Sequence, residues 1–310
     1  MKISFCTTCM GRTHHLKQTL PKNIRENLPR ADKLDPDVEF VVLDYNSQDG
    51  LEEWIKSDPE MIEYMRKGIL VYARTTEPQS FRMAHAKNMA HRLATGDVLC
   101  NTDADNFLGP HFATELAHIF QQNPHVIAHP ARILGQNISV DERGFFGRIA
   151  VTRKGFYDLG GYNENRFKGW GCEDSHFLLR AYAIGLKPYS VFDKSFFETI
   201  GHGDSERIQN MADKETSIRN LRRCDESYVL RKASILRNQF YMALSFAQSN
   251  RDGDFGCGRV ETGLEAREQI LQPVITHPSY LKFAFNGISG FLESKAQTSP
   301  SHVDLSHSLE

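Results

Sequence analysis

Two aspartates, Asp103 and Asp105, directly follow an apolar run at 97–102 that is typical of a buried strand. Open α/β sheets bind their ligands at the carboxyl ends of the strands. Side chains at i and i+2 of an extended chain point to the same side, so we expect the two carboxylates to hold one divalent cation. Oxygen ligands of this kind suit Mn²⁺ or Mg²⁺. The alternative is a solvated turn, because Asn106 and Gly109 are turn-forming residues.

A second polar segment follows the strand expected at 39–44 and contains Asp44, Asn46 and Asp49. Its carboxylates can accept hydrogen bonds from a base N–H or from ribose hydroxyls. The same residues can also form a turn and cap a helix that starts at Leu51. Both interpretations remain open at this point.

The elements that position these groups alternate between strand-like and helix-like patterns, which predicts an α/β fold built from βαβ units. Pro21 is expected to kink or interrupt the first helix. The expected strands are 2–8, 39–44, 69–73, 97–102, 126–130, 145–152 and 187–192, and the expected helices include 83–94, 111–122, 173–184 and much of 205–247. Residues 160–171 are expected to form a long functional loop.

Composition excludes several classes of function. The 37 basic and 39 acidic residues give a net charge of −2, which excludes a general nucleic-acid or anionic-membrane binder. No run approaches the ~20 apolar residues of a membrane span, so we expect a cytoplasmic protein, with peripheral membrane contact left open. The six cysteines are expected to be reduced thiols, and the pair Cys6 and Cys9 has no second C-x-x-C partner for a zinc site.

Five ordered motifs then reveal a resemblance that covers residues 3–203. Residues 5–12, 41–50, 86–99 and 103–105 resemble the nucleotide-binding half of family 2 glycosyltransferases with the GT-A fold. Residues 160–164 and 169–174 look like the acceptor-side motif shared by β-1,4-galactosyltransferases and polypeptide N-acetylgalactosaminyltransferases. The order of the motifs makes the resemblance more specific than any one of them.

The resemblance implies a Rossmann-like, mostly parallel twisted sheet flanked by helices, with a helical C-terminal extension. The expected parts are a nucleotide-sugar-binding half at 1–105, an acceptor-binding and catalytic half at 106–204, a helical extension at 205–295 and a flexible tail at 296–310.

The resemblance also assigns residues to roles. The residues expected to bind the donor are Thr7, Thr8, Arg12, Asp44, Asn46, Asp49, Lys87, Asn88, Asp103 and Ala104. The metal is expected on Asp103, Asp105 and His202, and the acceptor on Tyr162, Trp170, Gly171 and Glu173.

Asp174 is the better candidate for the catalytic base, with Glu173 holding the acceptor hydroxyl. In the first turn of a helix two adjacent side chains diverge by ~100°, so we expect them to serve different tasks. Acidic residues that merely complement the helix dipole are the alternative.

Together these expectations describe a metal-dependent enzyme that moves a sugar, with inversion, from a UDP-hexose or UDP-N-acetylhexosamine to a hydroxyl of a carbohydrate or glycolipid acceptor. One alternative is a non-catalytic relative that binds sugar or protein. The other is a sugar-phosphate nucleotidyltransferase, although the Gly-rich N-terminal loop of that class is absent and Gly11 stands alone after the first strand.

Overall fold

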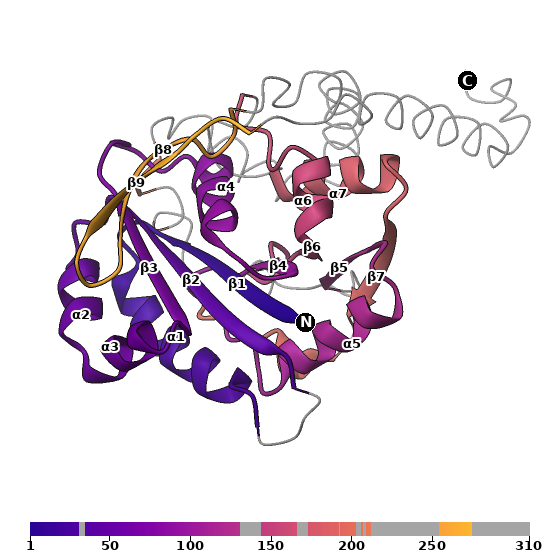
Figure 1. Cartoon of the computed structure of the whole chain (residues 1–310), viewed down its shortest axis with the longest axis horizontal. Helices are drawn as coiled ribbons and strands as arrows, with labels where there is room; N and C mark the ends of the chain where they lie inside the picture. Colours follow the sequence, from indigo (N-terminus) through magenta and orange to yellow (C-terminus); the bar gives the residue numbers. More distant parts are fainter. Residues whose placement is uncertain are drawn as a thin grey trace, which may run out of the picture.

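The computed structural model describes residues 1–30, 35–130, 144–165, 173–191, 193–202, 206, 209–211 and 254–274. Within these residues nine strands form one sheet in the order β7-β5-β6-β4-β1-β2-β3-β8-β9 (Figure 1). The strands are β1 (Lys2–Cys9), β2 (Asp37–Tyr45), β3 (Leu70–Thr75), β4 (Val98–Asn101), β5 (Val126–Pro130), β6 (Ala150–Thr152), β7 (Lys187–Val191), β8 (Gly258–Thr262) and β9 (Arg267–Leu271).

The four central strands β4, β1, β2 and β3 pair in parallel. Outside them the sheet is mixed, because β6 runs antiparallel to both β4 and β5, and β8 runs antiparallel to β3. The α/β class is confirmed, and the parallel arrangement holds for the centre rather than for the whole sheet. Eight of the nine residues of β2 are buried, as expected for a parallel strand covered on both faces.

Helices cover both faces of the sheet (Figure 1). They are α1 (Thr13–Asn27), α2 (Leu51–Ser57), α3 (Pro59–Arg66), α4 (Met83–Leu93), α5 (Phe112–Gln122), α6 (Arg153–Asp158) and α7 (Glu173–Ala183). Helices α1, α2, α3 and α5 pack into one apolar core, and α4, α6 and α7 pack into a second core on the opposite face.

Of the two effects expected of Pro21, the interruption of the first helix is wrong, because α1 runs through it without a break, and the kink stays a prediction. A proline in a helix removes one backbone donor and crowds the preceding turn. Here Leu16, Leu20 and Ile24 are all buried along the core face of the helix, and that packing offsets the local cost.

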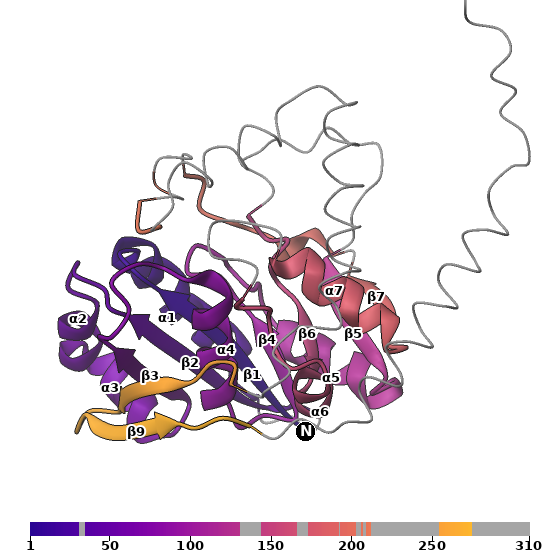
Figure 2. The same ribbon diagram turned by 90° about the horizontal axis from the view of Figure 1, so that it is seen from above.

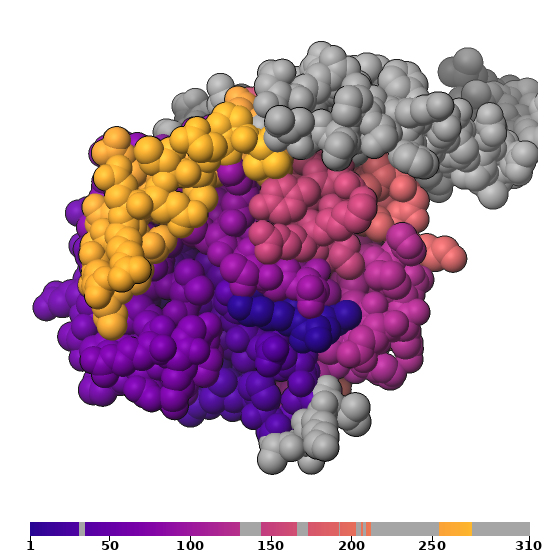
Figure 3. Space-filling model, in the orientation of Figure 1, coloured from indigo at the N-terminus to yellow at the C-terminus, as the bar shows by residue number. Residues whose placement is uncertain are grey.

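The prediction that residues 205–295 form a helical extension is also wrong for one part, since 258–271 form the β8–β9 hairpin. The hairpin extends the sheet beyond β3 and lies alongside that strand (Figure 2). In the space-filling view it covers this edge of the molecule (Figure 3). Arg92 fixes the segment before the hairpin, because its guanidinium donates to the carbonyl oxygens of Phe255 at 2.8 Å and Gly256 at 3.1 Å.

The C-x-x-C pair is structural. Cys6 belongs to the core on one face of the sheet and Cys9 to the core on the other, and both are free thiols. Side chains that point to opposite faces of a strand cannot share a metal ion. Within the described parts of the chain, no helix has the length and apolarity that a membrane crossing needs. Residues 212–253 of the expected helical segment and the tail at 296–310 lie outside the described residues.

Candidate active site

Strands β1, β2 and β4 end at the same edge of the sheet because they are parallel. This edge carries the residues that the sequence predicts for the donor. Thr7 is buried and Thr8 half-buried near the end of β1, and Arg12 follows that strand just before α1. Ala104 is buried in the core, so only its backbone is available, and its carbonyl oxygen already accepts from Thr19 Oγ1 at 2.7 Å.

Asp44 at the end of β2 is fully buried and anchors the turn that follows. Its Oδ1 accepts from the Ser47 N–H at 2.7 Å, and its Oδ2 accepts from the Tyr72 hydroxyl at 2.8 Å. Burial raises the pKa of Asp44, and these two hydrogen bonds, which lower it, only partly offset that effect. Asn46 adopts a left-handed backbone (φ 60°), and its amide donates to the Pro78 carbonyl oxygen at 2.8 Å. The turn interpretation of this segment is therefore confirmed.

Asp49 does not cap α2, which begins after Gly50 without a side-chain cap. Its carboxylate instead accepts from both the backbone N–H (2.8 Å) and the hydroxyl (2.6 Å) of Thr13, the first residue of α1. A carboxylate at a helix N-terminus pairs with free N–H groups and with the positive end of the helix dipole. Asp49 thus ties the β2 edge to α1.

Asp103 and Asp105 follow β4 in a turn, not in the extended chain that we expected, because the Asn106 N–H donates to the Asp103 carbonyl oxygen at 3.0 Å. Asp103 Oδ1 accepts from Asn101 Nδ2 at 3.1 Å. Burial raises the pKa of Asp103 to about 6; Lys87 opposes this shift, and the neighbouring charges of Asp105 and Asp174 add to it. The two aspartates are thus electrostatic neighbours despite the turn.

His202 lies against Asp105, with 2.6 Å between Nε2 and Oδ2. A short backbone ladder brings the two residues together: the Phe107 N–H donates to the Glu198 carbonyl oxygen at 2.9 Å, and the Ile200 N–H donates to that of Asp105 at 2.8 Å. His202 therefore contacts Asp105 at the end of β4, and Asp103 interacts with Asp105 through its charge. Among the described residues, these three predicted ligands do not form a group whose ligand atoms all lie within 4.8 Å of one another.

Lys87 of α4 connects this group to the start of α7. Its buried ammonium donates to Glu173 Oε1 at 2.9 Å and to Asp174 Oδ1 at 2.7 Å. Burial alone lowers the pKa of Lys87, but the charges of Asp174, Glu173 and Asp103 outweigh it and raise the pKa well above its ordinary value. The lysine stays charged inside a cluster of three carboxylates, and its contact with the donor stays a prediction.

Glu173 and Asp174 converge on Lys87, contrary to the expected divergence, because the long lysine side chain reaches both. Their exposure differs: the side chain of Glu173 is 3% exposed and that of Asp174 is 25% exposed. Burial and the charge of Asp174 raise the pKa of Glu173 to about 7, against the effect of Lys87. Of the pair, Asp174 is the carboxylate that solvent reaches.

Asn88 and Tyr162 are structural, which corrects their predicted contacts with donor and acceptor. Asn88 is fully buried; its amide donates to the Tyr162 carbonyl oxygen (2.8 Å) and to Glu164 Oε1 (2.7 Å), and its oxygen accepts from the Tyr162 N–H (2.7 Å). The Tyr162 ring is fully buried and stacks on Phe177, with 4.4 Å between ring centroids. Asn88 and Tyr162 therefore hold the 160–164 loop, which precedes α7, in place.

The sequence analysis missed Gly147. A Cβ atom at this position would lie 3.0 Å from Asp103 Oδ2 and 3.1 Å from Asp174 Oδ2. Both carboxylates therefore lie close to this glycine, and the side chain of a larger residue would press against them. The sequence pattern carries no signal for this position, because the role of the glycine depends on the two carboxylates beside it.

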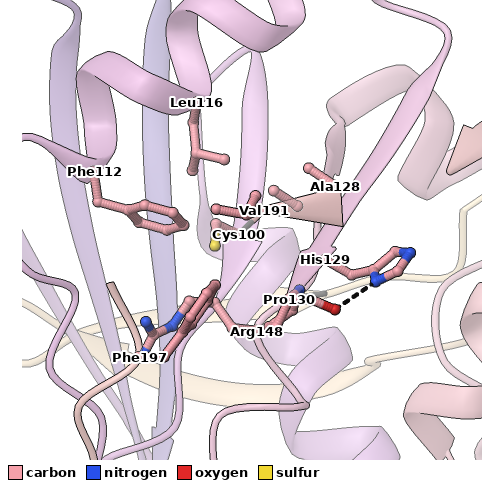
Figure 4. Close-up of a pocket in the computed structure, with 10 residues that line it drawn as sticks. Cys100, Phe112, Leu116, Ala128, His129, Pro130, Arg148, Val191 and Phe197 are labelled. Atoms are coloured by element: carbon pink, nitrogen blue, oxygen red, sulfur yellow. Dashed lines mark hydrogen bonds between the residues drawn. The ribbon is translucent and has the colours of Figure 1, made fainter. Parts of the chain in front are cut away.

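Arg148 was missed too. Its guanidinium lies 5.7 Å from the ring centroids of both Phe112 and Phe197, and Nη2 donates to Asn106 Oδ1 at 3.0 Å. Asn106 in turn donates to Asp105 Oδ1 at 2.8 Å. Burial lowers the pKa of Arg148 to about 10. The small apolar pocket beside these residues is lined from β4, β5 and α5, on the face opposite α4 and α7, and is not the catalytic cluster (Figure 4).

Trp170 and Gly171, predicted to bind the acceptor, lie outside the described residues. At one edge of the sheet the structure brings together the remaining charged groups, which are Arg12, Lys87, Asp103, Asp105, Glu173, Asp174 and His202.

The fold and this cluster define a glycosyltransferase of the GT-A class, and comparison with known proteins agrees. The model of the family "Glycosyl transferase family 2" matches residues 4–184. The chain belongs to this family, as the resemblance predicted.

A solved structure with a TM-score above 0.5 has the same fold. The mannosyltransferase PcManGT from Pyrobaculum calidifontis, in complex with GDP-Man and Mn²⁺, is 20% identical with a TM-score of 0.52, over 80% of this chain and 71% of that one. Two further structures have a TM-score of 0.48: S. aureus TarS 1-349 in complex with UDP (14% identity, 63% of this chain) and GalNAc-T7 with UDP, GalNAc and Mn²⁺ (16% identity, 63% of this chain). This chain covers 59% of the TarS chain and 43% of the GalNAc-T7 chain. A search of curated proteins gives no match.

Proposed function

We propose that this protein transfers a sugar from a nucleoside diphosphate sugar to a hydroxyl group of a carbohydrate or glycolipid acceptor, with inversion at the anomeric carbon. The observation that carries the proposal is that Asp103 Oδ2 and Asp174 Oδ2 both lie close to Gly147, at 3.0 and 3.1 Å from the position that a Cβ atom would take there. One carboxylate comes from the predicted metal motif and the other is the predicted base. A sugar whose diphosphate sits at Asp103 would then present its reacting carbon near Asp174.

The donor set suits Mn²⁺ or Mg²⁺ on Asp103, Asp105 and His202. Two carboxylates and an imidazole are ligands that Mn²⁺ accepts. Burial raises the pKa of Asp103 and the charges of Asp105 and Asp174 add to that shift, so a dication would favour the ionised carboxylate. His202 Nδ1 is buried with no hydrogen-bond partner. When bound, the ion would supply positive charge to stabilise the departing nucleoside diphosphate.

Asp174 is the proposed general base. A general base accepts the proton of the acceptor hydroxyl, and Lys87 Nζ donates to Asp174 Oδ1 at 2.7 Å. Lys87 also orients the Asp174 carboxylate, because the same ammonium donates a second hydrogen bond to Glu173. Glu173, with a pKa raised to about 7, is proposed to bind the acceptor hydroxyl from its buried position.

UDP is the proposed nucleotide, on the strength of the sequence motifs and of the two UDP complexes among the similar structures. The PcManGT complex holds GDP-Man instead, so donors of both bases belong in the test.

The test is a donor screen with Mn²⁺ that measures release of the nucleoside diphosphate and transfer to added acceptors. We expect Asp105→Asn to lose Mn²⁺-linked UDP binding. Asp174→Asn should retain that binding and lose transfer. Asp158→Asn, which removes an exposed carboxylate paired with Lys154, is the control and should change neither.

Full transfer by the Asp174 variant would contradict its role as base. An α-linked product from an α-linked donor, read by NMR of the anomeric proton, would contradict inversion. If no donor yields product or stabilises the wild type, the proposed function is wrong.

A further inference from the structure

The carboxylate of Glu206 lies among three side chains from the start of α1. Its Oε1 accepts from Arg12 Nη1 at 2.8 Å and lies 3.3 Å from His14 Nε2 and 3.6 Å from His15 Nε2. Glu206 is distant in sequence from all three. The Glu206 carboxylate, an anion that belongs to the protein itself, therefore occupies the position at which these three nitrogen-bearing side chains converge.

This place is electrically suited to anions. Arg12 carries a permanent charge, and it stands at the N-terminal cap of a 15-residue helix that has no acidic residue in its first turn. The N-terminus of a helix carries partial positive charge and attracts phosphate and carboxylate groups. Arginine and histidine N–H groups can donate to such an anion.

A bound metal is the rival explanation, because the ligand atoms of His14, His15 and Glu206 lie within 4.8 Å of one another. The Arg12 guanidinium argues against it, since it already donates to the same Glu206 oxygen. A dication there would face both that charge and the positive end of α1. The observations favour an anion.

The position that the Glu206 carboxylate occupies lies next to the proposed metal site. The His15 ring stacks on the His202 ring with 5.4 Å between centroids, and His202 contacts Asp105 at 2.6 Å. His15 is 4% exposed, and its Nδ1 is buried with no hydrogen-bond partner. A diphosphate held at Asp103 and Asp105 therefore lies within reach of the start of α1.

Asn210 also contacts residues at the edge of the sheet where the donor is proposed to bind. Its amide donates to the Met10 carbonyl oxygen at 2.6 Å, and its own carbonyl oxygen accepts from the Phe81 N–H at 2.7 Å. Glu206 and Asn210 thus each contact the residues that follow β1, where the nucleotide is proposed to bind.

We propose that Arg12, His14 and His15 form a phosphate subsite for the donor diphosphate, and that Glu206 fills this subsite until the diphosphate displaces it. The inference rests on the proposed function. Glu206 is an internal competitor, so donor binding includes the breaking of its ion pair with Arg12.

The experiment measures binding of UDP with Mn²⁺, and of inorganic pyrophosphate with Mg²⁺, by isothermal titration calorimetry. Glu206→Gln keeps the shape of the side chain and removes its charge, so we expect about tenfold tighter binding of both ligands, which corresponds to about 1.4 kcal/mol. Adding His14→Gln to the Glu206 variant should weaken both again; His14 is largely exposed, so this change leaves the core intact.

Glu60→Gln is the matched control. Glu60 pairs with Arg25 at the other end of the same helix, at 2.9 Å, and its loss should leave both affinities unchanged.

The outcomes separate this inference from the proposed function. If the wild type binds UDP with Mn²⁺ and Glu206→Gln leaves the affinity equal or weaker, the subsite is refuted and the function stands. If the wild type binds Zn²⁺ alone and Glu206→Gln abolishes that binding without tightening pyrophosphate, the cluster is a metal centre and the inference is wrong. If pyrophosphate binding tightens in the variant but no sugar donor is used, the subsite stands and the proposed function fails.

Discussion

Replacement of Lys87 by methionine tests the charge arrangement of the catalytic cluster. The change keeps most of the side-chain volume and removes the one ammonium that donates to both Glu173 and Asp174. Removing one partner of a buried ion pair leaves an uncompensated charge and costs about 3–5 kcal/mol. We expect the free energy of unfolding at pH 7.5 to fall by that amount.

The loss should depend on pH in a defined direction. Burial already raises the pKa of Glu173 from 4.5 to about 7 with the lysine in place, so its carboxyl favours the folded state below about 4.5 and that contribution is lost as pH rises through about 7. Without Lys87 the pKa rises further, the native state binds more protons than the unfolded state, and stability increases as pH falls. The deficit of the variant should therefore be smaller at pH 5.5 than at pH 7.5.

The assay is urea denaturation followed by far-UV circular dichroism at both pH values. Lys67→Met is the control, because that lysine is exposed and pairs only with Glu63 on α3. Adding Glu173→Gln to the Lys87 variant should recover about 1 kcal/mol or more, since it removes one of the stranded charges. A deficit under 1 kcal/mol at pH 7.5, or one that grows on acidification, would refute the reasoning.

Three further substitutions test single contacts. Gly147→Ala should reduce transfer at least tenfold with little change in stability, because its Cβ would lie 3.1 Å from Asp174 Oδ2; steady-state kinetics and thermal unfolding measure the two effects. Asn88→Ala should lower the free energy of unfolding by about 1–3 kcal/mol in urea denaturation, since it strands buried polar groups of the 160–164 loop. Asp49→Ala should cost about 1 kcal/mol in the same assay through the lost bonds to Thr13.

A different result would contradict each of these three predictions. Gly109→Ala is a poor control because that glycine has a left-handed backbone (φ 76°), so the wild type is the reference for the Gly147 variant. Unchanged transfer by Gly147→Ala would mean that the space between the two carboxylates is unused. Wild-type stability in the other two variants would mean that solvent replaces the contacts without loss.

The sequence was sufficient for the central strands and for the edge at which the site forms. Long apolar runs define β1, β2 and β4, and the position of a polar motif after a parallel strand places it at the binding edge. Asp103 and Asp105 were placed at this edge in this way, whereas Glu173 and Asp174 were predicted from the family resemblance.

The partners of these residues depend on contacts between segments far apart in the chain. Asp49 could not be matched to Thr13, nor Lys87 to the two acids of α7, because propensity and spacing describe only near neighbours. Asn88 was mistaken for a donor contact because its burial follows from the packing of the 160–164 loop. Gly147 has no side chain, and its importance lies only in what surrounds it.

The β8–β9 hairpin has a consequence for how the chain is made. Ala73 of β3 pairs with Thr262 of β8, and Arg92 of α4 donates to the backbone at Phe255. This edge of the sheet is therefore completed only after residues much later in the chain have been synthesised. At a synthesis rate of ~5–20 residues per second, about 10–40 s separate the emergence of the two strands from the ribosome. During that time β3 presents unpaired N–H and C=O groups. The half of the molecule that carries the predicted donor site is therefore finished late in synthesis, and its open edge is the place where a nascent chain can pair wrongly or engage a chaperone.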